Sequence, residues 1–253
     1  MRTLLALTAR PYRWTLLTAL KNGWLGRLKT MYRAGRDKMT AYAAARTGET
    51  IELITFRQTT YGVSLEHVQM VFASSWIRKS APSIIHDIGS HRTWVLGIGA
   101  RYPVTSLDVR EPPIKLDNET FALGRAEALP WKDGSVDFLT SLHSIEHFGL
   151  GAYGDDFDAF GDHKAAKEIA RVVKPGGTLI LTTTVTGGAT YTVFDAHRVY
   201  DLAELHGMFS DFDILEERFF SKQRSQFIGP DQLTREVKPH GWDLYLLAAR
   251  RKA

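Results

Sequence analysis

Two carboxylates and a glycine stand where short apolar runs of the sequence end. Asp87 lies near the end of one run and is followed by Gly89 and Ser90, and Asp108 follows the next run. Glycine lets a ligand approach the backbone closely, and a serine there can cap a following helix. An acid at the tip of a second strand can accept both hydroxyls of a ribose. The pattern predicts a nucleoside site.

The segment after Gly89 lacks the second glycine of a dinucleotide-binding fingerprint. Ser90, His91 and Arg92 follow instead, so no cradle for a pyrophosphate is expected. A nucleoside ligand without a pyrophosphate is therefore favoured over NAD.

The elements that must position these residues alternate between strands and helices from Pro82 onward. Seven strands are predicted in this part of the chain, at 83–88, 104–109, 120–123, 136–141, 178–185, 213–219 and 243–249, with helices at 94–101, 163–173 and 202–208. This alternation predicts an α/β fold with a mostly parallel sheet that is covered on both faces. Ligands of such sheets bind beyond the carboxyl ends of the strands, where the strand order reverses.

Further motifs follow in a fixed order. They are Ala126-Glu127-Ala128-Leu129-Pro130-Trp131, Ser135-Val136-Asp137-Phe138, Glu146-His147 and Lys174-Pro175-Gly176-Gly177. Together with the acid–glycine turn, they resemble class I S-adenosylmethionine-dependent methyltransferases over roughly residues 82–250. The resemblance implies a Rossmann-like fold with a mostly parallel seven-stranded sheet and helices on both faces. Segments 141–155 and 195–200 are similar to a bacterial branch of unknown function that is linked to surface-polysaccharide synthesis.

The resemblance also implies S-adenosylmethionine as the cofactor. Asp87 and Gly89 would lie against its methionine portion, Asp108 would hold the ribose, and Leu142 would lie near the sulfonium. The cofactor-binding residues expected on this basis are Asp87, Gly89, Ser90, Asp108, Val109, Arg125, Ala126, Glu127 and Leu142. Arg125 departs from the family, which often has an Asp here that reads the adenine amino group. Glu127, a backbone carbonyl or stacking alone would then hold the adenine.

Methyl transfer to a sugar hydroxyl needs a general base, because a hydroxyl is a poor nucleophile near neutral pH. We expect the base to be His147 or His143, with Asp155 orienting it or binding sugar hydroxyls. The expected acceptor-binding residues are Tyr153, Asp158, His197 and Arg198. Arg198 would pair with a carboxylate or phosphate of the acceptor.

Two other interpretations of this region stay open. His143, Glu146 and His147 match the spacing of a zinc-protease motif, but that motif needs a helix and this segment leaves a strand. No metal site is predicted, although a divalent ion on the loop at 149–161, which is rich in Asp, remains an alternative. The histidines could also be scaffold, and the loop acids could simply be solvated.

The positive charge of the chain is concentrated at its start. Residues 1–48 carry ten Lys and Arg against one acid, a balance of +9 in a chain of net charge +4. We therefore expect a basic aromatic helical extension over 1–80, followed by the methyltransferase domain at 81–253. The extension would bind an anionic membrane surface or glycan-assembly proteins, or form a lid on the core. Nucleic acid is not an expected partner, since the rest of the chain is acidic.

The absence of cysteine excludes disulfides, thiolate metal sites and cysteine nucleophiles. No run approaches the roughly 20 apolar residues of a spanning helix, and no signal peptide is apparent. We expect a cytoplasmic enzyme, peripheral at the inner membrane, that methylates a sugar hydroxyl in surface-polysaccharide synthesis. The alternatives are a small-molecule or lipid-linked acceptor, or a catalytically silent subunit of a glycan-assembly complex.

Overall fold

The computed structural model describes residues 63–193, 196–238 and 240–253. The basic aromatic segment at residues 1–48 lies outside the described residues, so the predictions that depend on it stay predictions. The compact unit that contains the sheet spans Gly62–Ala253. Helix α3 (Leu65–Ser80) is part of this unit, whereas the sequence-based division at residue 80 placed it in the extension.

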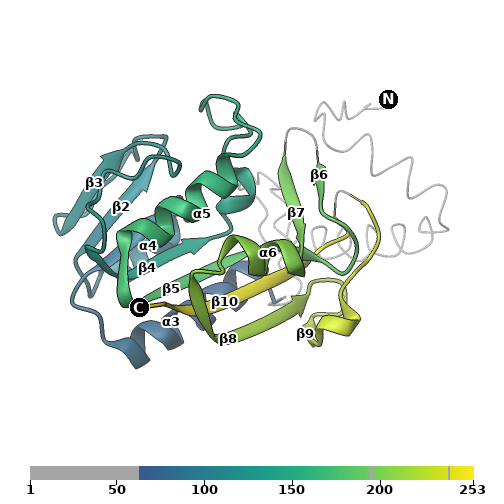
Figure 1. The fold of residues 1–253 in the computed structure, drawn as a ribbon. Coiled ribbons are helices and arrows are strands. Elements are labelled where there is room, and N and C mark those ends of the chain that lie inside the picture. Colours follow the sequence, from purple (N-terminus) through teal and green to yellow (C-terminus); the bar gives the residue numbers. More distant parts are fainter. Residues whose placement is uncertain (1–62, 194–195, 239) are drawn as a thin grey trace, which may run out of the picture. The chain divides into compact units, whose positions relative to one another are not determined.

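The seven predicted strands form one continuous path in the sheet. In the order β3-β2-β1-β4-β5-β10-β8, the first five are parallel, and β10 runs antiparallel to both of its neighbours (Figure 1). Their bounds are β1 Ile85–Ile88, β2 Val104–Asp108, β3 Glu119–Leu123, β4 Val136–Leu142, β5 Val173–Thr186, β8 Phe212–Ser221 and β10 Asp243–Arg251. The strand order reverses between β1 and β4, which is where a ligand is expected.

Three short strands were not predicted. They are β6 (Tyr191–Val193), β7 (His197–Asp201) and β9 (Gln226–Ile228). Strand β7 pairs with both β5 and β6, and β9 extends the sheet beyond β8. Tyr200 and Asp201 of β7 pair with the end of β5, and the Arg198 carbonyl accepts a hydrogen bond from the Thr184 hydroxyl at 2.6 Å.

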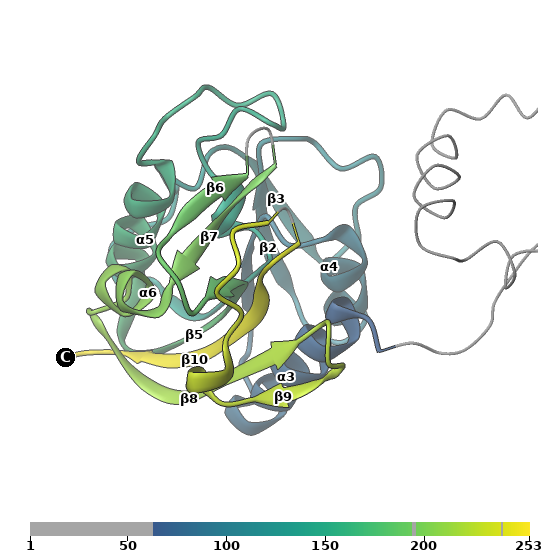
Figure 2. The ribbon, with the colours of Figure 1, turned by 90° about the vertical axis from the view of Figure 1, so that its right-hand side faces the viewer.

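Helices cover both faces of the sheet. Helices α5 (Gly161–Val172) and α6 (Leu202–Met208) lie on one face, and α3 and α4 (Arg92–Gly99) lie on the other (Figure 2). Each pair closes its own apolar core, one around Ile169 and Leu205 and one around Phe72 and Trp94. The two short 3-10 helices are Ile145–His147 and Pro230–Gln232.

Local signals fix the ends of these helices. The Ser64 side chain accepts a hydrogen bond from the backbone N–H of His67, and Asp201 accepts one from that of Glu204, as helix N-caps do. Along α3 the buried positions follow helical spacing, so the helix packs one face on the sheet. None of the helices in the described part of the chain is both long enough and apolar enough to span a membrane.

Candidate active site

The turn after β1 is built around the buried carboxylate of Asp87, whose residue is 1% exposed. Its Oδ1 accepts a hydrogen bond from the Ser90 backbone N–H at 3.2 Å. Its Oδ2 accepts bonds from the Ser90 hydroxyl at 2.7 Å and the Thr140 hydroxyl at 2.6 Å. The Leu142 N–H donates to the Ser90 hydroxyl at 2.9 Å. Asp87 and Ser90 thus join the ends of β1 and β4 into one rigid turn.

Gly89 gives this turn its close approach to a ligand. Its φ of +66° is a left-handed conformation that side chains disfavour. A Cβ here would also lie 3.2 Å from the Ser144 Cβ and 3.3 Å from the Phe148 ring. Only glycine fits here without displacing these neighbours, so the backbone itself forms the wall of the cavity.

Asp108 stands at the end of β2, and its side chain is 23% exposed. Its Oδ1 accepts bonds from the Arg110 backbone N–H at 2.8 Å and from the Arg110 Nε at 3.2 Å. The Arg110 guanidinium lies 4.2 Å from the centre of the Tyr153 ring. A ribose bound at Asp108 would therefore share the carboxylate with Arg110, a residue that sequence reasoning did not assign. Its position two residues after Asp108 was the available signal.

The loop expected to flank the adenine is anchored from helix α5. Glu168 accepts a hydrogen bond from the Leu129 N–H at 2.8 Å, and the Arg171 guanidinium donates to the Leu129 carbonyl at 3.0 Å. Arg125 pairs with Glu127 and with Asp156, each at 3.1 Å. Arg125 thus connects this loop to the Asp-rich loop rather than lining the cavity.

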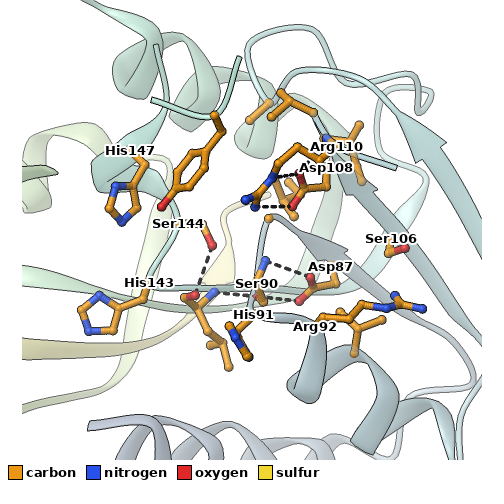
Figure 3. A pocket seen from close by; sticks show the side chains of 18 of the residues that line it. Asp87, Ser90, His91, Arg92, Ser106, Asp108, Arg110, His143, Ser144 and His147 are labelled. Atoms are coloured by element: carbon orange, nitrogen blue, oxygen red, sulfur yellow. Dashed lines mark hydrogen bonds and ion pairs between the residues drawn. The ribbon is translucent and has the colours of Figure 1, made fainter. Parts of the chain in front are cut away.

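One cavity of about 920 Å³ joins most of the predicted residues. Figure 3 shows Asp87 and Asp108 on one side of it and the imidazoles of His143 and His147 on the other. The predicted residues that line it are Asp87, Gly89, Ser90, Asp108, Val109, Ala126, Glu127, Leu142, His143, His147, Tyr153 and Asp155. Four predicted residues are not in its lining: Arg125, Asp158, His197 and Arg198.

The two cavity histidines are held by different partners. The Nδ1 of His143 is hydrogen-bonded to Oε1 of Glu146, which is buried. The Nδ1 of His147 lies 2.7 Å from the carbonyl oxygen of Ala196. A carbonyl only accepts, so this nitrogen carries a proton and Nε2 of neutral His147 is left with a free electron pair.

His197 lies next to this pair rather than in the cavity wall. Its ring centre is 6.2 Å from that of His147 and 5.7 Å from that of Trp242. Its Nε2 is buried without a hydrogen-bond partner, and burial lowers the pKa of the imidazole. His197 is therefore held neutral beside the two cavity histidines.

Arg198 is buried beneath the loop that follows His143 and His147. It is 6% exposed, its Nε lies 3.3 Å from Oδ2 of Asp162, and its Nη1 donates to the Phe148 carbonyl at 2.7 Å. Asp158 in turn pairs with Lys164 at 2.6 Å. The guanidinium and this carboxylate thus fasten the loop to β7 and α5, and neither group faces the cavity.

Gly149 allows this loop to pack tightly. At its φ of +74°, a Cβ would lie 2.3 Å from the Asp158 carbonyl oxygen. The loop presents Tyr153, which is 41% exposed, and its ring centre is 5.5 Å from that of His147.

In the residues that the structure describes, no group of three or more His, Asp or Glu side chains is placed to hold a metal ion.

Burial raises the pKa of Asp87 to about 6, even though hydrogen bonds from Thr140 and Ser90 act to lower it. A carboxyl whose pKa is raised on folding stabilises the fold at low pH, and this contribution is lost as the pH rises from about 4 through about 6. The Asp87→Asn variant lacks this titration. We expect the free energy of unfolding of the wild type to fall relative to the variant over this pH range.

Urea denaturation at a series of pH values between 4 and 7 measures this difference. Asp213→Asn, at an exposed position, is the matched control and should run parallel to the wild type. Parallel curves for Asp87→Asn and the wild type would show that the Asp87 carboxyl keeps its ordinary pKa.

Comparisons with known proteins bear on the fold. The model of a family described as "Caenorhabditis protein of unknown function, DUF268" matches residues 126–239, less than half of the chain. No curated protein matches the chain significantly. Many solved structures do match.

Three of these structures illustrate the similarity. A 1,6-didemethyltoxoflavin-N1-methyltransferase from Burkholderia thailandensis, with bound S-adenosylhomocysteine, has a TM-score of 0.52 and 15% identity over 73% of this chain and 79% of its own. A geranyl diphosphate C-methyltransferase from Streptomyces coelicolor has a TM-score of 0.52 and 14% identity over 74% and 78%. The [4+2]-cyclase SpnF has a TM-score of 0.54 and 16% identity over 73% and 81%.

These similarities confirm the predicted fold, which is the Rossmann-like fold of class I methyltransferases. Because one of the three is a cyclase, the fold by itself does not determine the reaction. The function has to be argued from the cavity.

Proposed function

We propose that this chain, which has the class I methyltransferase fold, transfers a methyl group from S-adenosylmethionine to a sugar hydroxyl. The observation that carries the proposal is the single cavity in which the Gly89 turn and the Asp108 carboxylate face the imidazoles of His143 and His147. This arrangement combines a nucleoside-binding wall with a proton acceptor, which is the combination that methylation of a hydroxyl needs.

The residues present fit the proposed cofactor. The cavity volume of about 920 Å³ lies within the range of cofactor sites. Asp108 would accept ribose hydroxyls, and the backbone at Gly89 would lie against the methionine portion. Glu127, with its side chain 9% exposed, would stand near the adenine. When bound, the cofactor supplies a methyl carbon that a hydroxyl oxygen can attack, while the electron pair of the carbon–sulfur bond leaves on sulfur.

The chain's own part in this reaction is to orient the acceptor and to remove its proton. An imidazole Nε2 takes the proton of the attacking hydroxyl, so that no alkoxide has to form in water. Tyr153, whose ring centre is 5.5 Å from that of His147, and Asp155 line the cavity and would contact the acceptor. Arg198 and Asp158 would act indirectly, by fastening the loop that carries Tyr153.

The sugar of a surface polysaccharide is the acceptor that we propose. It is favoured by the resemblance, expected from the sequence alone, of segments 141–155 and 195–200 to a branch linked to such synthesis, and by the histidine and aspartate groups around Tyr153. Incubating the full chain with methyl-labelled cofactor and a panel of sugars and nucleotide sugars tests this directly, with mass spectrometry locating the label. Label on a sugar oxygen supports the proposal; label only on nitrogen or carbon acceptors would contradict it.

Replacing Asp108 with alanine should weaken binding of S-adenosylhomocysteine by about ten- to a hundredfold. Hydrogen bonds to a charged group contribute roughly 1.5–3 kcal/mol, and the ribose would lose its acceptor. Calorimetry measures the change, with Asp117→Ala, at an exposed position outside the cavity, as the control. Equal affinity in the Asp108→Ala variant and the wild type would remove Asp108 from the cofactor site.

The proposed membrane or glycan-assembly partner depends on residues 1–48, which carry the excess positive charge. Deleting them should release the protein from vesicles that contain anionic lipid, because the attraction is electrostatic. Co-sedimentation measures the bound fraction, and vesicles of neutral lipid are the control. Undiminished sedimentation of the truncated protein with anionic vesicles would contradict the membrane proposal.

A further inference from the structure

His143 has a strained backbone at the point where β4 ends. Its φ of +53° is left-handed, a conformation that is unfavourable for a residue with a side chain. Its N–H donates to the Thr182 carbonyl at 2.9 Å and to the Thr182 hydroxyl at 3.1 Å, and that hydroxyl donates to buried Gln69 at 2.8 Å. The surrounding structure thus enforces the strain. Strained residues held in this way occur at functional sites.

The partner of the His143 side chain is a buried carboxylate. Glu146 is 1% exposed; its Oε1 bonds to the His143 Nδ1 and its Oε2 accepts a bond from the Thr183 hydroxyl at 2.9 Å. Burial alone would raise the pKa of Glu146, but the neighbouring imidazoles of His143 and His147 lower it to about 2. The carboxylate is therefore ionised at neutral pH. A buried ionised group destabilises the fold unless it is paired. The ionised carboxylate of Glu146 therefore depends on its hydrogen bond with His143.

This pairing decides which nitrogen of His143 can react. An ionised carboxylate only accepts hydrogen bonds, so the His143 Nδ1 keeps its proton and Nε2 is the nitrogen that can take one up. His143 lines the cavity, and its side chain is 22% exposed. Buried acids that hold an imidazole in one tautomer also stabilise the imidazolium that forms when the base accepts a proton.

His147 lacks such a partner. The group facing its Nδ1 is the neutral carbonyl of Ala196, so an imidazolium there would be stabilised less directly. The rings of Tyr153 and His197 lie beside His147, at 5.5 and 6.2 Å between centres, and the ring of Trp242 lies 5.5 Å from that of His143. The only carboxylate that touches either imidazole in the described structure is Glu146.

We infer that Glu146 is a positioning residue that makes His143, rather than His147, the general base of the proposed methyl transfer. The acceptor proton passes to the His143 Nε2, the Nδ1 proton stays in place, and Glu146 remains ionised throughout. The inference rests on the proposed function for its chemistry. The pairing of Glu146 with His143 can nevertheless be tested without any acceptor.

The test is the ¹⁵N NMR spectrum of the full chain labelled in histidine, at a pH where the imidazoles are neutral. We expect His143 to show the Nδ1–H tautomer alone in the wild type. In Glu146→Gln the carboxylate is replaced by an amide, which can donate as well as accept a hydrogen bond. We therefore expect both tautomers of His143 to appear in this variant. Thr183→Val, which removes the other hydrogen bond of Glu146, should keep the single tautomer of His143.

The wild-type spectrum is decisive even if a variant does not fold. An Nε2–H tautomer of His143 in the wild type, or an unchanged spectrum in folded Glu146→Gln, would overturn the inference. Titrating the same wild-type sample with S-adenosylhomocysteine separates the two proposals. Absence of binding would contradict the proposed function and leave the tautomer result standing, whereas binding together with the wrong tautomer would contradict only the role of Glu146.

Discussion

Replacing His143 with glycine should lower the rate of methyl transfer by about 10²–10⁴-fold, because the variant lacks the proposed general base. General bases contribute rate factors of about this size. The left-handed backbone at this position suits glycine, which loses no favourable conformation there. Replacement with glycine or with alanine leaves Glu146 without its His143 partner, so the two variants should differ in stability through the backbone strain alone.

Initial rates with the acceptor found in the transfer assay measure the loss of activity, and urea denaturation measures the free energy of unfolding. His143→Ala should lose as much activity but be less stable than His143→Gly, because alanine keeps the backbone strain. His206→Ala, in helix α6 outside the cavity, is the control and should keep wild-type activity. Wild-type turnover in His143→Gly would exclude His143 as the base and leave His147 as the candidate.

The second large effect is expected at Arg198. Its replacement with alanine should lower the free energy of unfolding by about 3–5 kcal/mol, because it leaves a buried carboxylate without its cation. That carboxylate belongs to Asp162, which is 1% exposed and also accepts a hydrogen bond from the Tyr200 hydroxyl at 3.0 Å. The loop that carries Tyr153 would lose its anchor at the Phe148 carbonyl as well.

Denaturant unfolding monitored by circular dichroism measures this loss. Arg224→Ala, at an exposed position that makes no ion pair in the described structure, is the matched control and should change stability by less than about 0.5 kcal/mol. A similarly small change for Arg198→Ala would contradict the structural role of its ion pair with Asp162.

The sequence was sufficient for the framework of the site. Asp87 and Asp108 follow apolar runs, and because the carboxyl ends of parallel strands meet at one edge of a sheet, both could be placed at one site before the structure was known. The central strands carry short segments rich in Val, Ile and Leu that are bounded by turn residues. These features depend on local sequence, so they could be predicted.

Features that depend on contacts between distant segments could not be predicted. From the sequence, Arg198 was expected to bind an anionic group of the acceptor. Its burial results from the packing of β7 against helix α5, which carries Asp162. The same holds for Arg125, because its partner Asp156 lies 31 residues further along the chain. Strand β6 has only three residues, and β7 begins with His197 and Arg198 and ends with Asp201, so neither has the apolar character of the predicted strands. Glu146 was part of a recognised motif, but its pairing with His143 depends on a left-handed turn that sequence patterns do not reveal.

The central claim is that the cavity between β1, β2 and β4 binds a sulfur-containing nucleoside. Calorimetric titration of the full wild-type chain with S-adenosylhomocysteine tests it most directly. We predict saturable one-to-one binding with a Kd in the micromolar range, equivalent to about −8 kcal/mol. Absence of any heat of binding up to millimolar ligand would contradict the claim and favour a catalytically silent subunit.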